Sequence, residues 1–283
     1  MARPKIGAHV SVSGGIFNCV ENAKKIEAET IQIFGSSPQK WQTKIPPKEE
    51  IKKFKNALVG SGLEPVFLHA SYLVNLASPN PNLIEMSVKN LAEHLKIAEL
   101  LDAKGLIFHV GSATTSKKED AIDRAAKAIK KVMEGFQGKA FLIMENAAGG
   151  GQKIGTTIHE LEYLFKKVRS KKLKICIDTA HAFEAGIIDN FGQKEIKKLF
   201  NEMDEKIGID NIAALHINDS KTPAGSKHDR HENIGEGYIG LEGFQNLAKE
   251  KRAGNIPWIL EVPGFDGSGP DQKNINILRS LFS

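Results

Sequence analysis

Short apolar runs alternate along the chain with longer segments in which apolar residues recur at helical spacing. Most of the runs are too apolar to be half-exposed, which is typical of strands buried on both faces. They occupy residues 5–10, 30–34, 65–70, 105–110, 140–146, 173–179, 212–218 and 257–262. The segments with helical spacing occupy residues 20–28, 49–59, 83–101, 121–133, 158–168, 194–203, 241–250 and 275–282.

Strands and helices in strict alternation over 283 residues give about 35 residues per unit, the size of a βα repeat. The alternation predicts one α/β domain over residues 1–283, a single (β/α)8 TIM barrel with its active site at the carboxyl-terminal ends of the strands. An open doubly wound sheet is the alternative. It would require a G-x-G-x-x-G turn after the first strand, and SGGIF at residues 13–17 lacks that spacing.

Composition narrows the class of protein. Hydrophobic residues make up 41% and charged residues 26% of the chain, which is typical of a globular protein and excludes bulk disorder. No run approaches the roughly 18 apolar residues of a membrane span, and the start has no signal-peptide stretch. Cys19 and Cys176 are too few for a disulfide framework and fit a reducing cytoplasm. The net charge of +5 permits a polyanionic partner without requiring one.

Metal-ligating residue types gather at the predicted carboxyl ends of the strands. Only the second strand, which ends at Phe34, lacks such a group. Acidic residues are seldom buried unless they are paired or bind a metal, and a set rich in imidazole without thiolate favours zinc over magnesium or calcium. The residues are His9, His69, His109, Glu145, Asp178 with the adjacent His181, His216 and Glu261.

The loop after the seventh strand adds a D-x-H pair, Asp229 and His231, in a stretch rich in Gly, Ser and Pro. His228 would point elsewhere if this pair shares a face, whereas His94 and His159 lie in predicted helices as packing or surface residues. Without His9, nine ligand-type residues remain. A zinc ion takes about four ligands, so nine residues with a bridging carboxylate suffice for three ions. Such multi-metal sites are typical of the hydrolysis of phosphate esters and peptides.

These motifs resemble those of the endonuclease IV family, the zinc-dependent apurinic/apyrimidinic (AP) endonucleases of base-excision DNA repair. The resemblance implies a (β/α)8 barrel with three Zn²⁺ ions, some exchangeable for other divalent metals. It also implies hydrolysis of double-stranded DNA on the 5′ side of abasic sites, leaving a 3′-hydroxyl. The matching segments are IGAHVSVSGG (6–15), LHASYLVNLASP (68–79), FHVGS (108–112), MENAAGGG with the following IG (144–155), CIDTAHAFEAG (176–186), LHINDSKTPAGSKHDRHENIGEG (215–237) and LEVPG (260–264).

The resemblance also implies roles for individual residues. Glu145 and Glu261 are the catalytic carboxylates, which fix the ions and offer acceptors for the proton of the attacking water. Glu145 bridges the first two ions, and His9 lies at the edge of the cluster rather than among the ligands. The first ion takes His69, His109 and Glu145, the second Asp178, His216 and Glu261, and the third His181, Asp229 and His231.

Two loops carry the expected DNA contacts. Tyr72 and Leu73 match one DNA-probing loop of the family. Gln39 and Lys40 lie in the other, where the family commonly has Arg at the position of Gln39. Abasic double-stranded DNA is the expected partner, with no protein partner evident and a monomer as the expected state. The family also often has Cys at Ala180 and Thr at Val262, and neither change removes a ligand.

Two other functions remain as alternatives. A sugar isomerase or epimerase of the same barrel superfamily would hold one divalent ion on Glu145, Asp178, His216 and Glu261. It would have no use for the five further ligand types, which favours the nuclease. A barrel that binds damaged DNA without cutting it would have lost some ligands, and none is lost.

Overall fold

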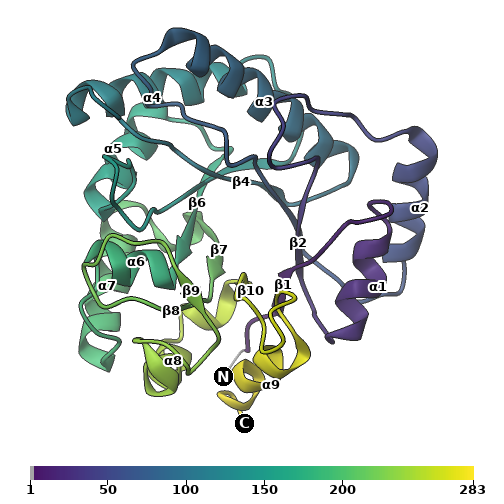
Figure 1. Ribbon diagram of the computed structural model, residues 1–283, viewed down its shortest axis with the longest axis vertical. Helices are drawn as coiled ribbons and strands as arrows, with labels where there is room; N and C mark the ends of the chain where they lie inside the picture. The colour runs from purple at the N-terminus through teal and green to yellow at the C-terminus, as the bar shows by residue number, and fades with distance from the viewer. Residues whose placement is uncertain (1–2) are drawn as a thin grey trace.

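Eight parallel strands close into a barrel in the computed structural model, which describes residues 3–283 (Figure 1). Each strand lies within one of the predicted apolar runs, so the predicted (β/α)8 fold is confirmed. The last strand, β10, pairs with both β1 and β7 and thereby closes the ring. The strands are β1 (Ile6–His9), β2 (Ile31–Phe34), β3 (Val66–His69), β4 (Gly105–His109), β5 (Phe141–Glu145), β6 (Leu173–Asp178), β7 (Ile212–His216) and β10 (Trp258–Leu260).

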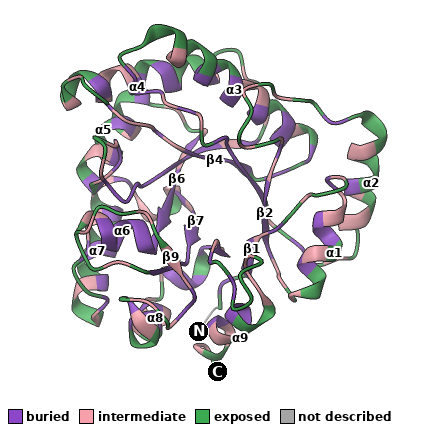
Figure 2. Cartoon of the chain, in the orientation of Figure 1, coloured by how far each residue is buried: buried purple, intermediate pink, exposed green. Residues whose placement is uncertain are grey.

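Helices surround the barrel and turn their apolar faces towards it, so that the buried positions lie on the inner side of the ring (Figure 2). In α4 the buried residues recur every three or four positions, as helical amphipathicity requires. Within residues 3–283, none of the helices combines the length and apolarity needed to span a bilayer. The helices are α1 (Asn18–Lys25), α2 (Lys48–Leu58), α3 (Pro81–Leu100), α4 (Lys118–Met133), α5 (Ile158–Val168), α6 (Thr179–Ala185), α7 (Gln193–Lys206), α8 (Gly240–Ala248) and α9 (Gln272–Ser280).

Two features were not predicted. The chain turns helical immediately after β6, because Asp178 Oδ1 accepts a hydrogen bond from the His181 backbone N–H at 2.8 Å and caps α6. The pattern of apolar residues predicts no helix here. A small antiparallel pair, β8 (Asp219–Ser220) with β9 (His231–Glu232), also forms within the loop after β7. Strands of two residues show no hydrophobic period, so the sequence pattern could not indicate them.

The inside of the barrel is filled below the carboxyl-terminal rim. Six buried side chains form a cluster of their own, distinct from the larger core that includes the surrounding helices. They are Phe67, Ile107, Ile143, Cys176, Ala214 and Ile259. Polar side chains at the strand ends therefore rise from a packed apolar floor, which fixes their positions and excludes water from below.

Candidate metal centre

The nine predicted ligands converge at the carboxyl-terminal ends of the strands. Eight of them form groups of donor atoms in which every atom lies within 4.8 Å of the others. Glu145 belongs to the first and second of these groups, and Asp178 to the second and third. The groups are His69, His109 and Glu145; Glu145, Asp178, His216 and Glu261; and Asp178, His181 and His231.

Strand register explains the first two groups. His109 pairs with Glu145 across β4 and β5, and Asp178 pairs with His216 across β6 and β7. The two residues of each pair therefore lie side by side on the same face of the sheet, and all four are the last residues of their strands. The Glu145 carboxylate, which is fully buried, lies 3.1 Å from His69 Nε2 and 3.0 Å from His216 Nδ1.

The third group depends on the loop after β7, which also brings in the ninth ligand, Asp229. Asp229 Oδ1 lies 3.2 Å from His181 Nε2 and 3.8 Å from His231 Nε2. Asp178 Oδ2 also approaches this group, at 3.7 Å from His231 Nε2. The resemblance assigned Asp178 to the second ion alone, whereas in the structure it lies between the second and third groups.

The imidazoles are held in the tautomers that suit a metal. His69 Nδ1 faces the Ala70 carbonyl oxygen at 2.9 Å, His181 Nδ1 faces that of Asn146 at 3.1 Å, and His231 Nδ1 faces that of Glu261 at 3.3 Å. A carbonyl oxygen only accepts, so each of these ring nitrogens carries the hydrogen. In the neutral rings, the form that binds metals, the Nε2 atoms then present lone pairs to the centre, the arrangement typical of metal-ligating histidine.

Gln32 on β2 is a site residue that the sequence analysis missed. It is fully buried, its side-chain oxygen accepts from His216 Nε2 at 2.8 Å, and its amide nitrogen donates to Glu261 Oε1 at 2.5 Å. The same nitrogen lies 2.9 Å from His9 Nδ1. The second strand therefore contributes to the site after all. The polar side chain inside the apolar stretch IQIF was the available signal.

Two asparagines that follow strand ends were also missed. Asn146 accepts from the Asp178 backbone N–H at 2.6 Å. Asn218 donates to Asp178 Oδ2 at 2.6 Å and accepts from the Glu261 backbone N–H at 2.7 Å. These amides connect neighbouring strands and orient the carboxylates. Their position beside ligand-type residues in the sequence was the signal.

Charge keeps the carboxylates ionised despite their burial. Burial would raise the pKa of Glu145, but the imidazoles around it, His109 and His216 foremost, hold the pKa well below its usual value. Burial would likewise raise the pKa of Glu261, yet His216 and a hydrogen bond with His9 lower it. Burial would lower the pKa of His181, whereas the charge of Asp178 and further acidic contacts raise it well above normal. Ionised carboxylates are the form that binds metals.

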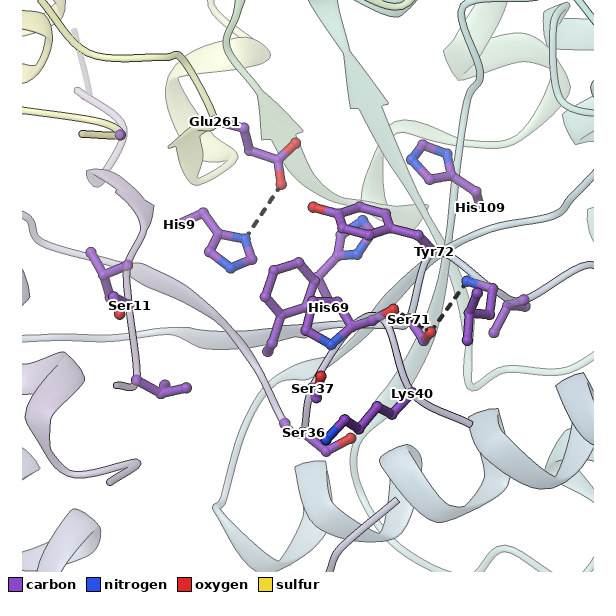
Figure 3. Close-up of a pocket in the computed structure, with 18 of the residues that line it drawn as sticks. His9, Ser11, Ser36, Ser37, Lys40, His69, Ser71, Tyr72, His109 and Glu261 are labelled. Carbon is purple, nitrogen blue, oxygen red and sulfur yellow. Dashed lines mark hydrogen bonds and ion pairs between the residues drawn. The ribbon is translucent and has the colours of Figure 1, made fainter. Parts of the chain in front are cut away.

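A cavity of about 2170 Å³ opens above these side chains (Figure 3). Tyr72, Leu73 and Lys40 line it, and the Tyr72 side chain lies above His69 with 66% of the residue exposed. The two predicted DNA loops adjoin, because the Pro38 carbonyl oxygen accepts from the Tyr72 backbone N–H at 3.2 Å. Gln39 is exposed but is not among the residues that line the cavity.

The donor set fits metal ions. His181 Nε2 and His231 Nε2 lie 3.4 Å apart, and the carbonyl contacts described above leave a lone pair on each when the ring is neutral. Two lone pairs repel unless a proton or a cation lies between them, and the adjacent Asp229 carboxylate adds negative charge. Nitrogen and oxygen donors without thiolate suit zinc. The residues thus fit the ions that the family implies, and their roles as ligands stay predictions.

Comparison with known proteins agrees with the fold. Residues 20–281 match the family described as xylose isomerase-like TIM barrel. A D-tagatose 3-epimerase-like protein has the same fold, with a TM-score of 0.74 at 22% identity over 98% of this chain and 97% of that one. The class of protein is therefore a xylose isomerase-like barrel with a cluster of metal-ligand residue types at its carboxyl-terminal end.

More similar relatives define the family. A probable endonuclease 4 of Halothermothrix orenii is 36% identical, with 97% of this chain and 99% of the relative covered. One from Aquifex aeolicus is 37% identical over 98% and 97% of the two chains. The crystal structure of endonuclease IV from Thermus thermophilus superposes with a TM-score of 0.86 at 31% identity, covering 99% of each chain. The chain belongs to the endonuclease 4 family.

Proposed function

We propose that this protein is a zinc-dependent AP endonuclease that hydrolyses the phosphodiester bond 5′ to abasic sites in double-stranded DNA and leaves a 3′-hydroxyl. The observation that carries the proposal is the linkage of three donor groups through Glu145 and Asp178 at the floor of one open cavity. Membership of the endonuclease 4 family supports the same reaction.

Three zinc ions would be held by the nine clustered side chains. His69 and His109 would hold the first, Asp178, His216 and Glu261 the second, and His181, Asp229 and His231 the third, with Glu145 shared by the first two. Zinc ions bound there supply positive charge for the phosphate and lower the pKa of water towards neutrality.

The two catalytic carboxylates differ in their access to the substrate. Glu145 is fully buried and is surrounded by imidazoles, so it fixes the geometry of the centre. The Glu261 side chain is 18% exposed and lines the cavity. Its Oε1 is oriented by Gln32 and lies 3.5 Å from His9 Nδ1. The contact between His9 and Glu261 is drawn in Figure 3. Glu261 is therefore the better placed of the two to accept the proton of the attacking water.

The walls of the cavity suit recognition of an abasic site rather than recognition of a particular base sequence. An abasic site lacks stacking and pairing, so its sugar leaves the helix at less cost than an intact nucleotide. Tyr72 and Leu73 would occupy or prop the gap, as wedge side chains do in DNA-bending proteins. Lys40 and Gln39 would meet the backbone from the adjacent loop.

The whole centre comes from one chain, so a monomer without a protein partner can perform the reaction. Light scattering with purified protein tests the monomeric state, with about the chain mass of 31.0 kDa expected.

Cys19 and Cys176 are both buried and unpaired, which supports a reducing cytoplasm as the place of action.

The sugar isomerase alternative is not favoured. It would use only Glu145, Asp178, His216 and Glu261, and would leave His69, His109, His181, Asp229 and His231 convergent without a role. The epimerase-like neighbour shares the fold at 22% identity, and fold alone does not determine activity.

A nicking assay on a labelled abasic duplex tests the proposed function. The wild-type protein should cut once, directly 5′ to the abasic site, and the upstream product should be extendable by a polymerase because it ends in a 3′-hydroxyl. An identical duplex without the lesion is the control. Binding of the abasic duplex without any nick would contradict the proposal and favour the non-enzymatic alternative.

A further inference from the structure

We propose that Lys153 is a DNA-contact residue, whose ammonium group binds a non-bridging phosphate oxygen of the damaged strand beside the third donor group. The inference rests on the proposed function, because it concerns the same substrate. Lys153 lies in the loop after β5, was absent from the residues expected to touch DNA, and lines the cavity.

The backbone holds Lys153 in a defined place. It forms an isolated antiparallel bridge with Ser112 in the loop after β4. On either side of it, the Ala113 N–H donates to the Gln152 carbonyl and the Ile154 N–H donates to the Gly111 carbonyl, both at 2.9 Å. Two loops at the cavity rim therefore brace each other, and the side chain starts from a fixed point.

The side chain reaches from that point to the third donor group. Lys153 Nζ lies 3.2 Å from Asp229 Oδ2, while the other oxygen of the same carboxylate faces His181. The Lys153 side chain is 37% exposed. An ammonium group has three donors, and the pair with Asp229 uses one of them, so the others can meet a ligand that enters the cavity.

Stability does not explain a lysine at this position. An exposed ion pair contributes little to folding, and a fixed positive charge is unfavourable beside a centre that gathers cations. An anionic substrate makes the positive charge of Lys153 favourable, because a phosphate placed between the ions and the ammonium group is attracted by both. The Asp229 carboxylate keeps the ammonium in place before the DNA arrives.

A phosphate contact has a quantitative signature in salt. Each contact between a cationic side chain and duplex phosphate contributes about 0.9 to the slope of log K against log salt concentration. Removal of Lys153 should therefore lower the steepness of that slope by about one contact, without loss of bound metal. A lysine that acted only in folding would not change the slope.

The experiment compares holoenzyme variants binding to the nicked abasic duplex, the product, by fluorescence anisotropy between about 50 and 200 mM salt. Lys153→Gln should reduce the slope by about 0.9, and Lys153→Arg should keep it. Lys166→Gln is the matched control, because Lys166 pairs with Glu162 at 2.6 Å on the outer helix α5 and does not line the cavity. It should leave the slope unchanged.

The outcomes separate this inference from the proposed function. If wild-type protein nicks the abasic duplex but Lys153→Gln keeps the wild-type slope, the phosphate contact is wrong and the nuclease assignment stands. If Lys153→Gln changes only the metal content, Lys153 acts on Asp229 rather than on DNA, which also overturns the inference. If wild-type protein neither nicks nor binds the duplex, both proposals fail.

Discussion

Glu145 and Asp229 are carboxylates of the same candidate centre, and the fold holds them in different ways. Glu145 ends a strand, is fully buried and contacts four imidazoles. Asp229 lies on a loop with 40% of its side chain exposed, and its ion pairs within the described residues are with His181, His231 and Lys153. Strand register thus builds the deep part of the centre, which contains Glu145. The outer part, which contains Asp229, depends on how the loop after β7 packs.

Glu184 on α6 stabilises the position of the loop after β7 through hydrogen bonds. Its Oε1 accepts from the Arg230 backbone N–H at 3.1 Å, between the two predicted ligands of the loop, and from Ser220 Oγ at 2.8 Å. Its Oε2 is buried without a hydrogen-bond partner among the described residues. Burial accordingly raises the pKa of Glu184. A single buried carboxyl therefore helps to place both Asp229 and His231.

Removal of metal should have the largest effect, because it affects both parts of the centre. Prolonged chelation should abolish nicking and lower the melting temperature by about 5 °C or more. Ions that bind only the folded state contribute about 2.7 kcal/mol at a hundredfold excess over Kd. Calorimetry and the nicking assay before and after zinc is restored measure both effects. An unchanged melting temperature after verified loss of metal would show that the ions do not connect the strand ends.

Glu145→Ala should come next and should separate the deep part from the outer part. It removes a carboxylate shared by two donor groups, so kcat should fall on the order of 10³-fold, the upper range for a single transition-state group. His231→Ala affects only the outer group, and about a 10–100-fold loss is expected. Single-turnover nicking rates compare the two. Equal losses would argue against a bridging role for Glu145.

Glu184→Ala should weaken the outer group without touching a ligand. We expect about one ion to be lost on dialysis and nicking to fall about tenfold, within the range for residues that orient ligands. Glu184→Gln should restore much of both, since its amide oxygen can still accept from Arg230 N–H. Metal content and kcat are measured together. Retention of every ion by the alanine variant would mean that the loop docks without Glu184.

The smallest effects should come from the two predicted DNA loops, which contain none of the nine predicted ligands. Tyr72→Ala should weaken binding to abasic duplex by about fivefold, the low end of the ~1–3 kcal/mol that aromatic stacking contributes, with metal content unchanged. Gln39→Arg should preserve or raise activity, because it introduces a planar group that can stack. If Tyr72→Ala and a Gln39/Lys40 double alanine both cut as well as wild type, these loops do not probe DNA.

The same contrast explains how much the sequence could predict. Strands show a period and end at recognisable residues, so the barrel and the strand-end members such as His109 and Glu145 could be predicted from pattern alone. Asp229 and His231, in the loop after β7, could be predicted as ligands only together with the other ligand types and the family resemblance. Glu184 and Lys153 act through contacts between residues distant in sequence, which a single sequence does not encode in any local pattern. For Gln32 the local signal, a polar residue inside IQIF, indicates a special position but not the partners His216 and Glu261.

The metal-to-protein ratio tests the central claim most directly. Elemental analysis after dialysis should give about three zinc ions per wild-type chain and about two for the Asp229→Ala/His231→Ala double variant, since only the loop-borne group is then removed. A wild-type ratio of one, unchanged in the double variant, would contradict a centre of three linked groups.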